Sequence, residues 1–160
     1  MPIMATAKSK LFIGGVLAQK NADFVAADFT SQTWVEITPL EGLGTLGDSA
    51  EAITFDAIGS GRRKKLKGVR DAGTMELVIG LDMEDDGQIA LLAAEKTSND
   101  YAFKLERDDA PPGGTPSQRL FIAIVMSAAE AYDTVNNVTR LNASLAVNSN
   151  VVRGDAAEDD

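Results

Sequence analysis

The sequence predicts a mainly β fold, an antiparallel β-sandwich or barrel with one flanking α-helix and long loops. Two segments, 75–81 and 140–148, alternate apolar and polar residues with the period of two that is typical of half-buried strands. One segment, 84–96, has a helical pattern, and glycine- and proline-rich stretches separate the apolar runs. With 160 residues, 44% of them hydrophobic and 24% charged, the chain has the size and composition of one globular domain.

The strand predictions follow the alternation along the chain. Met75, Leu77 and Ile79 share one face of their segment, and 141–147 and 101–105 show the same spacing. Segment 119–126 is apolar on both faces, as expected for a central strand covered on both sides. Further short strands are expected at 10–13, 34–37 and 53–57.

The helix is predicted over 84–96. Asp85 or Asp86 can cap its start, because a carboxylate accepts hydrogen bonds from the free amides of the first turn. Ile89, Leu92 and Ala93 are expected to form the buried stripe.

Three segments are expected to be long loops, at 39–49, 59–73 and 107–118, because glycine and proline recur in them. Loops of this length in a small domain are usually functional. We expect one domain over residues 1–153, followed by an acidic, disordered tail at 154–160.

The segment 59–73 concentrates positive charge in an acidic protein. It holds six of the fifteen Lys and Arg residues, although the net charge of the chain is −9. Like charges so close together repel one another, so an acidic surface on another copy of the chain is an attractive partner. The six cations are Arg62, Arg63, Lys64, Lys65, Lys67 and Arg70. The carboxylates expected to form the counter-surface, or to line a channel, are Glu76, Asp82, Glu84, Asp85, Asp86, Asp108 and Asp109.

An alternative interpretation is a soluble module that binds nucleic acid or another anion through residues 62–70. The segment 59–73 contains no aromatic residue for base stacking, and no GxxxxGK[ST] phosphate loop occurs in the chain. The acidic total also repels nucleic acid over most of the surface.

The composition argues against an enzyme. The chain has no histidine and no cysteine, so most catalytic and metal-binding constellations cannot be built, and we expect neither cofactor nor metal. The glycines of 42–47 lack the βαβ setting of a dinucleotide site. Segment 82–87 resembles the start of a calcium loop, but Ala93 occupies the position of the closing carboxylate. The longest apolar run, 120–126, is too short to span a membrane, so we expect no membrane anchor.

The order of these features resembles the tail tube proteins (major tail proteins) of long-tailed bacteriophages, of the lambda-like kind. The resemblance covers roughly residues 8–152. It rests on KSKLFIG, then TWVEITPLEGLGTLGDSAEAITF, the basic segment, KGVRDAGTMELVIGLDMEDDGQIALLAA, RLFIAIVMS and VTRLNASLAVNS.

The resemblance implies a structural virion protein, assembled in the bacterial cytoplasm. In that family six subunits form a ring, and rings stack into a hollow tube through which double-stranded DNA passes without tight binding. Segment 59–73 would reach the next ring, and the polar faces of 74–81 and 140–148, including Glu76, would line the channel. Arg140 would fit there only with a carboxylate beside it. Tape-measure, tail-tip and tail-terminator proteins would be partners, and a secretion-system tube is the alternative assembly.

Overall fold

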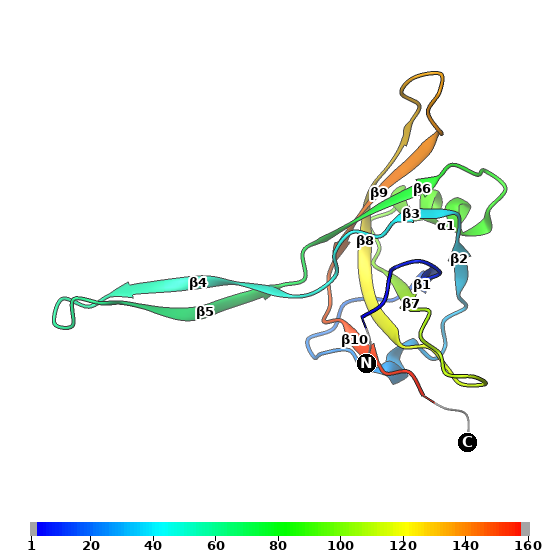
Figure 1. Cartoon of the computed structure of the whole chain (residues 1–160). Coiled ribbons are helices and arrows are strands. Elements are labelled where there is room, and N and C mark those ends of the chain that lie inside the picture. Colours follow the sequence, from blue (N-terminus) through cyan, green and yellow to red (C-terminus); the bar gives the residue numbers. More distant parts are fainter. Residues whose placement is uncertain (1–2, 158–160) are drawn as a thin grey trace.

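The computed structural model describes residues 3–157 and shows a β-rich body with one helix and a long projecting hairpin (Figure 1). The described strands of the body form one eight-stranded antiparallel sheet in the order β2-β1-β7-β8-β9-β6-β3, with β10 beside β8. Strands β4 and β5 form a separate two-stranded sheet. The strands are β1 (Lys10–Val16), β2 (Val35–Ile37), β3 (Leu40–Gly42), β4 (Ser49–Asp56), β5 (Arg63–Asp71), β6 (Thr74–Gly80), β7 (Tyr101–Glu106), β8 (Gln118–Ala131), β9 (Arg140–Val147) and β10 (Val152–Gly154); the helices are α1 (Asp86–Glu95) and the short 3₁₀ helix η1 (Ala26–Phe29).

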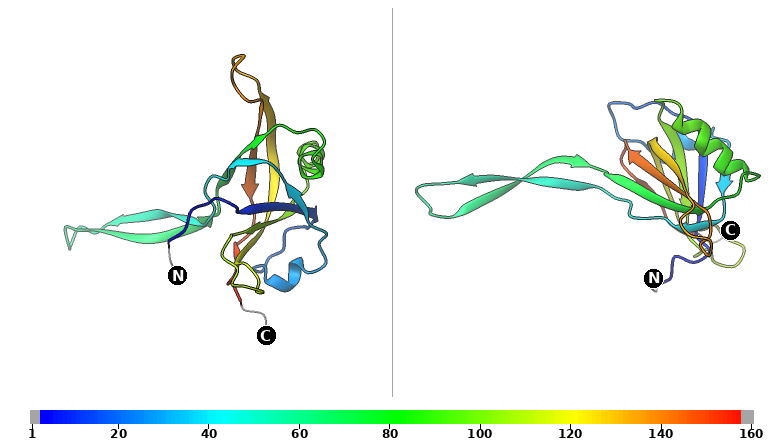
Figure 2. Two further views of the ribbon diagram at one scale, coloured as in Figure 1. Left: turned by 45° about the vertical axis from the view of Figure 1, so that its right-hand side comes forward. Right: turned by 90° about the horizontal axis from the view of Figure 1, so that it is seen from above.

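Strand β8 belongs to both layers of the body. Its first half pairs with β7, from Gln118 opposite Glu106 to Ala123 opposite Tyr101. Its second half pairs with β9, and the register shifts between Val125 and Ser127. The sheet bends along this strand, so β1, β2 and β7 lie across from β9, β6 and β3 (Figure 2). The predicted antiparallel sandwich is confirmed, with one long strand shared by its layers.

The core lies between these layers and follows the predicted alternation. Leu11, Ile13 and Phe103 from one layer share a single buried cluster with Leu77 and Leu145 from the other. The rings of Phe103 and Phe121 stack with centroids 5.6 Å apart. The expectation that 119–126 is covered on both sides is confirmed for its first part. Phe121 and Ala123 face this cluster, whereas Leu120 and Ile122 pack in a second cluster with Phe24, Phe29 and Ala102.

Helix α1 packs against β8, β2 and β1. Asp85 caps the helix, as predicted, by accepting a hydrogen bond from the Gln88 amide (3.1 Å), and it also accepts from the amide of Thr38 (3.1 Å). The buried Gln88 side chain donates to the carbonyls of Thr38 (2.5 Å) and Gly80 (2.8 Å). The start of the helix is therefore hydrogen-bonded to the residue after β2 and to the last residue of β6.

The predicted buried stripe of α1 is wrong in its phase. Leu92 is half-buried against the core, as predicted, but Ile89 is 48% exposed and Ala93 is exposed. Leu91 and Ala94 are buried instead, together with Gly87 and Gln88 of the first turn. The helical period was correct, but the side that faces the sheet is selected by the glycine and glutamine of the first turn. The spacing of apolar residues alone does not reveal this choice of side.

Replacing Gly87 with alanine is expected to destabilise the domain by about 3 kcal/mol, because overpacking at an unyielding site costs that much. An added Cβ would overlap the carbonyl oxygen of Glu36 and lie 2.6 Å from the Cα of Ile37, both of them backbone atoms. Urea unfolding followed by circular dichroism measures the change. Gly59→Ala is the control, because a Cβ there would meet no atom within 4 Å. Equal stability of the two variants would contradict the close packing of α1 on β2.

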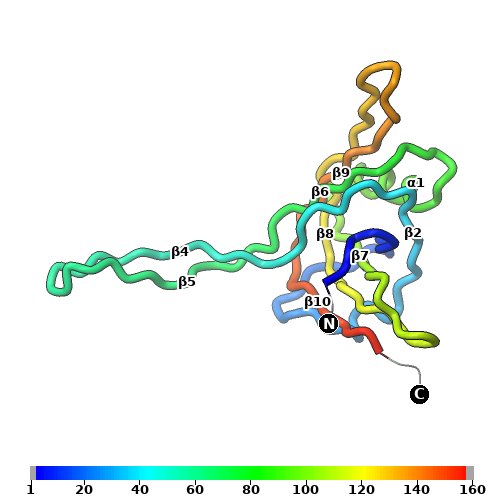
Figure 3. The backbone as a smooth tube through the Cα atoms, viewed as in Figure 1, coloured from blue at the N-terminus to red at the C-terminus, as the bar shows by residue number. Residues whose placement is uncertain are grey.

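The structure corrects two of the predicted loops. Segment 59–73 is largely strand β5, which pairs with β4 to form a hairpin that projects from the body (Figures 1 and 3). The alternation rule finds strands with one buried face, and this hairpin has none. Segment 39–49 contains the short edge strand β3. Segment 107–117 is a loop as predicted, and Gln118 begins β8.

The start of the acidic tail remains paired with the body. Gly154 lies in β10 opposite Gln118, and Ala157 forms a bridge with Thr115 through two backbone hydrogen bonds of 2.8 and 3.1 Å. The last three residues of the predicted tail, 158–160, lie outside the described residues.

Candidate assembly interface

The hairpin of β4 and β5, residues 49–71, is the most exposed element of the molecule, and we call it the arm. At about 3.3 Å per residue, the eight residues of β4 span roughly 26 Å. Each of its strands has one residue that is not fully exposed. A two-stranded hairpin is at best marginally stable in water, so a surface that covers the arm would stabilise it.

The pairing register divides the arm into two chemically different faces, because directly opposed residues of an antiparallel pair lie on the same face. Ile53 opposes Leu66 and Phe55 opposes Lys64, which places Ile53, Phe55 and Leu66 together. Their exposed fractions are 53%, 62% and 64%. We call these three residues the apolar face of the arm.

The opposite side of the arm carries most of the positive charge. Thr54 opposes Lys65 and Ala52 opposes Lys67, and the same face holds Arg63 and Arg70. We call Arg63, Lys65, Lys67 and Arg70 the cationic face. Lys64 lies on the apolar face, and Arg62 lies in the turn at the tip. The six predicted cations are thus all on the arm, but they do not share one face.

Two of the six cations are neutralised within the chain. Arg63 contacts Asp56 at 2.7 Å, and Arg70 contacts Asp48 at 2.9 Å. The hydrogen bond to Asp56 raises the pKa of Arg63. The other four cations form no ion pair with any residue between 3 and 157: Arg62, Lys64, Lys65 and Lys67.

The predicted acidic residues lie on the body. Asp82 and Glu84 are exposed in the turn before α1, and Asp86 is exposed as the first residue of the helix. Asp85 is engaged as the helix cap and is not available as a counter-charge. This capping also accounts for the acidic residues that resemble a calcium loop. In the 107–117 loop, Asp108 is exposed. Asp109 accepts hydrogen bonds from the amide (2.8 Å) and hydroxyl (2.6 Å) of Ser117, which hold its pKa below the usual range.

Glu76 lies on the exposed face of β6, opposite Ser144 of β9, whose hydroxyl donates to it at 3.3 Å. Asn142 and Ser127 are further exposed polar residues of β9 and β8. Glu76 therefore belongs to a polar outer face of the sheet, as the sequence suggested.

Arg140, at the end of the same sheet, has the carboxylate partner that its position required. Its Nε donates a hydrogen bond to one carboxylate oxygen of Glu41 (2.5 Å), and its Nη2 donates to the other (3.3 Å). This hydrogen bond lowers the pKa of Glu41 and raises that of Arg140. The pair connects the edge strand β3 to the start of β9.

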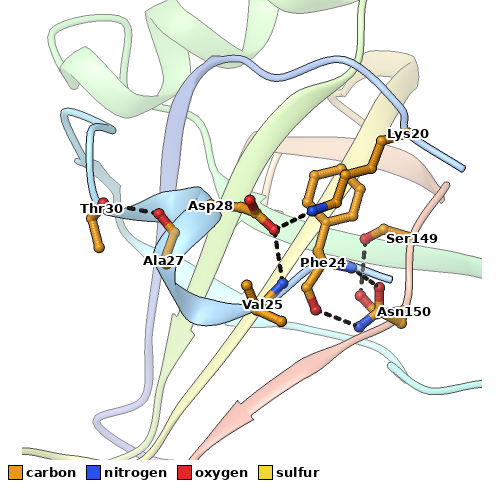
Figure 4. Close-up of polar contacts among 8 residues, drawn as sticks. All are labelled: Lys20, Phe24, Val25, Ala27, Asp28, Thr30, Ser149 and Asn150. Atoms are coloured by element: carbon orange, nitrogen blue, oxygen red, sulfur yellow. Dashed lines mark hydrogen bonds and ion pairs between the residues drawn. The ribbon is translucent and has the colours of Figure 1, made fainter. Parts of the chain in front are cut away.

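A polar network fastens the segment before η1 to the segment after β9, near the base of the arm (Figure 4). Asp28 accepts from Lys20 (2.6 Å) and from the amide of Val25 (2.8 Å), and the bond from Lys20 is the main reason that its pKa is lowered. Asn150 accepts from the Phe24 amide (2.7 Å) and donates to the Phe24 carbonyl (3.0 Å). These groups satisfy one another, so the network is structural. A hollow of about 390 Å³ beside it is bordered by residues of this network and by Asp48 and Arg70 of the arm base.

The apolar face of the arm was missed by the sequence analysis. Ile53 and Phe55 stand at strand spacing, which did predict a strand at 53–57. Leu66, however, sits among lysines, and only the register with β4 brings it to Ile53.

Within residues 3–157, no three His, Cys, Asp or Glu side chains gather as a metal site would require. No helix in that range is long and apolar enough to cross a membrane.

Comparison with known proteins places the chain by its structure, since no family model and no curated protein matches its sequence. A chain of the SPP1 tail tube superposes with a TM-score of 0.63 at 16% identity, covering 99% of this chain and 81% of that one. A chain of the anti-feeding prophage baseplate superposes with a TM-score of 0.69 at 11% identity, covering 97% of this chain and 98% of that one. A chain from the sheath-tube complex of PVC, an extracellular contractile injection system, superposes with a TM-score of 0.61 at 14% identity. This match covers 97% of this chain and 93% of that one. The resemblance noted in the sequence is confirmed at the level of architecture, and the chain has the tail tube fold.

Proposed function

We propose that this protein is a non-enzymatic structural subunit that repeats along the tube of a phage tail or of a phage-like injection particle. The observation that carries the proposal is the arm. It presents an exposed apolar face and a cationic face whose lysines pair with no carboxylate between residues 3 and 157, in a chain whose net charge is −9. A second copy of the same acidic chain can cover both faces.

The proposed assembly is a stack of six-membered rings in which the arm of one subunit lies on the body of a subunit in the next ring. The arm and the acidic parts of the body are different surfaces, so their contact is heterologous. Heterologous contacts close into rings or continue as filaments. The tail tube fold of the SPP1, PVC and anti-feeding prophage chains supports this arrangement.

The proposed channel is lined by the polar face of β6 and β9 that includes Glu76. Polar or negative walls give a passing DNA duplex no site for counterion release, whereas a basic lining would hold it. Double-stranded DNA would therefore pass without tight binding. In a phage the protein would belong to the virion tail, would assemble in the cytoplasm of the host bacterium, and would meet tape-measure, tail-tip and tail-terminator proteins.

The second candidate assembly is the tube of a contractile injection particle. It is favoured by the likeness to chains from the anti-feeding prophage and PVC particles. The proposed arm contact would serve in either tube, so the two candidates differ in what passes along the channel.

Electron microscopy of the concentrated protein tests the proposal. We expect hollow filaments or six-fold rings. Titration with a DNA duplex at low and raised salt should show at most weak binding. Monomers at all concentrations, together with tight and steeply salt-dependent DNA binding, would instead support the module that binds anions through residues 62–70.

A further inference from the structure

Three arginines gather around one hollow of the body, far from the arm in sequence. Arg107, Arg119 and Arg153 line a hollow of about 280 Å³ between the N-terminal segment and the sheet. Apolar residues form part of the remaining lining, namely Leu43, Leu46, Met75, Leu105 and Val151, and the N-terminal segment adds Met4, Ala5, Thr6 and Ser9. We call this site the arginine cavity.

The strand register brings two of these like charges together. Arg153 of β10 is the direct partner of Arg119 of β8. Like charges opposed across a strand pair destabilise the sheet. Burial lowers the pKa of Arg119, and the charges of Arg153 and Arg107 lower it further. A bound anion would relieve this repulsion.

The described part of the chain does not neutralise the cluster. None of the three arginines forms an ion pair with a residue between 3 and 157. Asp155 and Asp109 are the carboxylates whose charges act on Arg119. Asp109 also accepts two hydrogen bonds from Ser117 and keeps its charge, so two carboxylates stand against three cations.

A complementary segment lies elsewhere on the same chain, in the turn 82–86, which we call the acidic turn. Glu84 and Asp86 are exposed there and form no ion pair with a described residue. Met83, between Asp82 and Glu84, is 48% exposed. An apolar side chain flanked by carboxylates matches a cavity with apolar walls and cationic groups. A phosphate backbone would use the arginines but leave the apolar walls uncovered.

The two sites lie on different parts of the body, because α1, which contains and follows the end of the acidic turn, is at the upper right of the body in Figure 1 and β10 is at its lower end. A contact between such sites joins two copies side by side. The copy that contributes its arginine cavity still has a free acidic turn, and the copy that contributes its acidic turn still has a free arginine cavity. This is the geometry from which a ring is built.

We propose that the arginine cavity receives the acidic turn of a second copy of this chain, with Glu84 and Asp86 at the guanidinium groups and Met83 against the apolar walls. The inference deepens the proposed function, on which it rests, by assigning the contact between neighbours within a ring. The arm is left to the contact between rings.

Exchanging the charges of Arg153 and Glu84 tests whether the arginine cavity binds the acidic turn. Arg153→Glu alone and Glu84→Arg alone should each abolish ring formation, and the double variant should restore it, because the attraction is re-formed with opposite signs. Arg153→Glu should not lower the melting temperature of the monomer, since it replaces a like-charge pair with an opposite one. Lys96→Glu, at the exposed C-terminal end of α1, is the control and should assemble normally.

Disulfide cross-linking gives a second readout that does not need tubes, because the chain contains no cysteine. A variant with both Met83→Cys and Arg153→Cys should yield a ladder of covalent oligomers on mild oxidation at high concentration. Each single variant should yield at most dimers.

Normal assembly of either single charge variant, failure of the double variant to restore it, or absence of the ladder would overturn the inference. Weakened DNA binding by Arg153→Glu with unchanged assembly would overturn it in favour of nucleic acid. A ladder from a protein that never forms tubes would support the pairing while contradicting the proposed function.

Discussion

Replacing Lys65 and Lys67 with glutamate is expected to abolish tube growth while leaving the subunit folded. Both lysines lie on the cationic face of the arm and have no acidic partner among the described residues. The reversal turns attraction to an acidic neighbour into repulsion, and like charges facing each other cost several kcal/mol. The critical concentration for assembly should therefore rise by about a hundredfold or more, at 1.4 kcal/mol for each factor of ten.

Sedimentation measures assembly of this variant, and circular dichroism checks its fold. Lys65→Arg with Lys67→Arg is the matched control, because it keeps both charges in the same places. The wild-type protein should assemble less readily as salt is raised, since salt screens exposed charges. Tube growth by the glutamate variant at the wild-type concentration would remove the cationic face from the contact between subunits.

Serine at Ile53, Phe55 and Leu66 is expected to prevent assembly through a different physical cause. These side chains are more than half exposed in the single subunit, so their loss should change its stability by no more than about 0.5 kcal/mol each. Burial of each against a neighbour contributes about 1.5 kcal/mol or more. The three together should raise the critical concentration by roughly a thousandfold.

Salt dependence separates this variant from the charge variant. Raised salt should not restore assembly of the serine variant, because its lost contact is apolar. Val25→Ser is the control, since Val25 is 56% exposed but lies outside the arm. Normal tubes from the triple serine variant would mean that the apolar face of the arm stays in solvent.

Most of the body could be predicted from the sequence, because its strands have one buried face. The alternation of Met75, Leu77 and Ile79 reports directly on a sheet that covers a core. In the arm, the spacing of Ile53 and Phe55 predicted part of β4, but β5 could not be predicted as a strand, because neither face of the arm is buried within one subunit. The sequence of β5 is mostly that of a solvated loop, with Leu66 and Val69 as its large apolar residues.

The sequence predicted the positive charge of the arm but not how its residues are arranged on two faces. The concentration of lysine and arginine at 62–70 is visible in the sequence. Its division into two faces depends on a register with a bulge between Ala50 and Ala52, which no local pattern specifies. The arginine cavity was harder still to predict from the sequence, because Arg119 and Arg153 come together only through the pairing of β8 with β10.

The central claim is that the arm finds its partner on another copy of the chain. A cryo-electron microscopy reconstruction of the assembled protein tests this most directly. The account predicts density for β4 and β5 against the body of a neighbouring subunit, with Phe55 buried and Lys65 and Lys67 beside carboxylates. An arm that projects into solvent in the assembled particle, or one folded back onto its own subunit, would contradict the account.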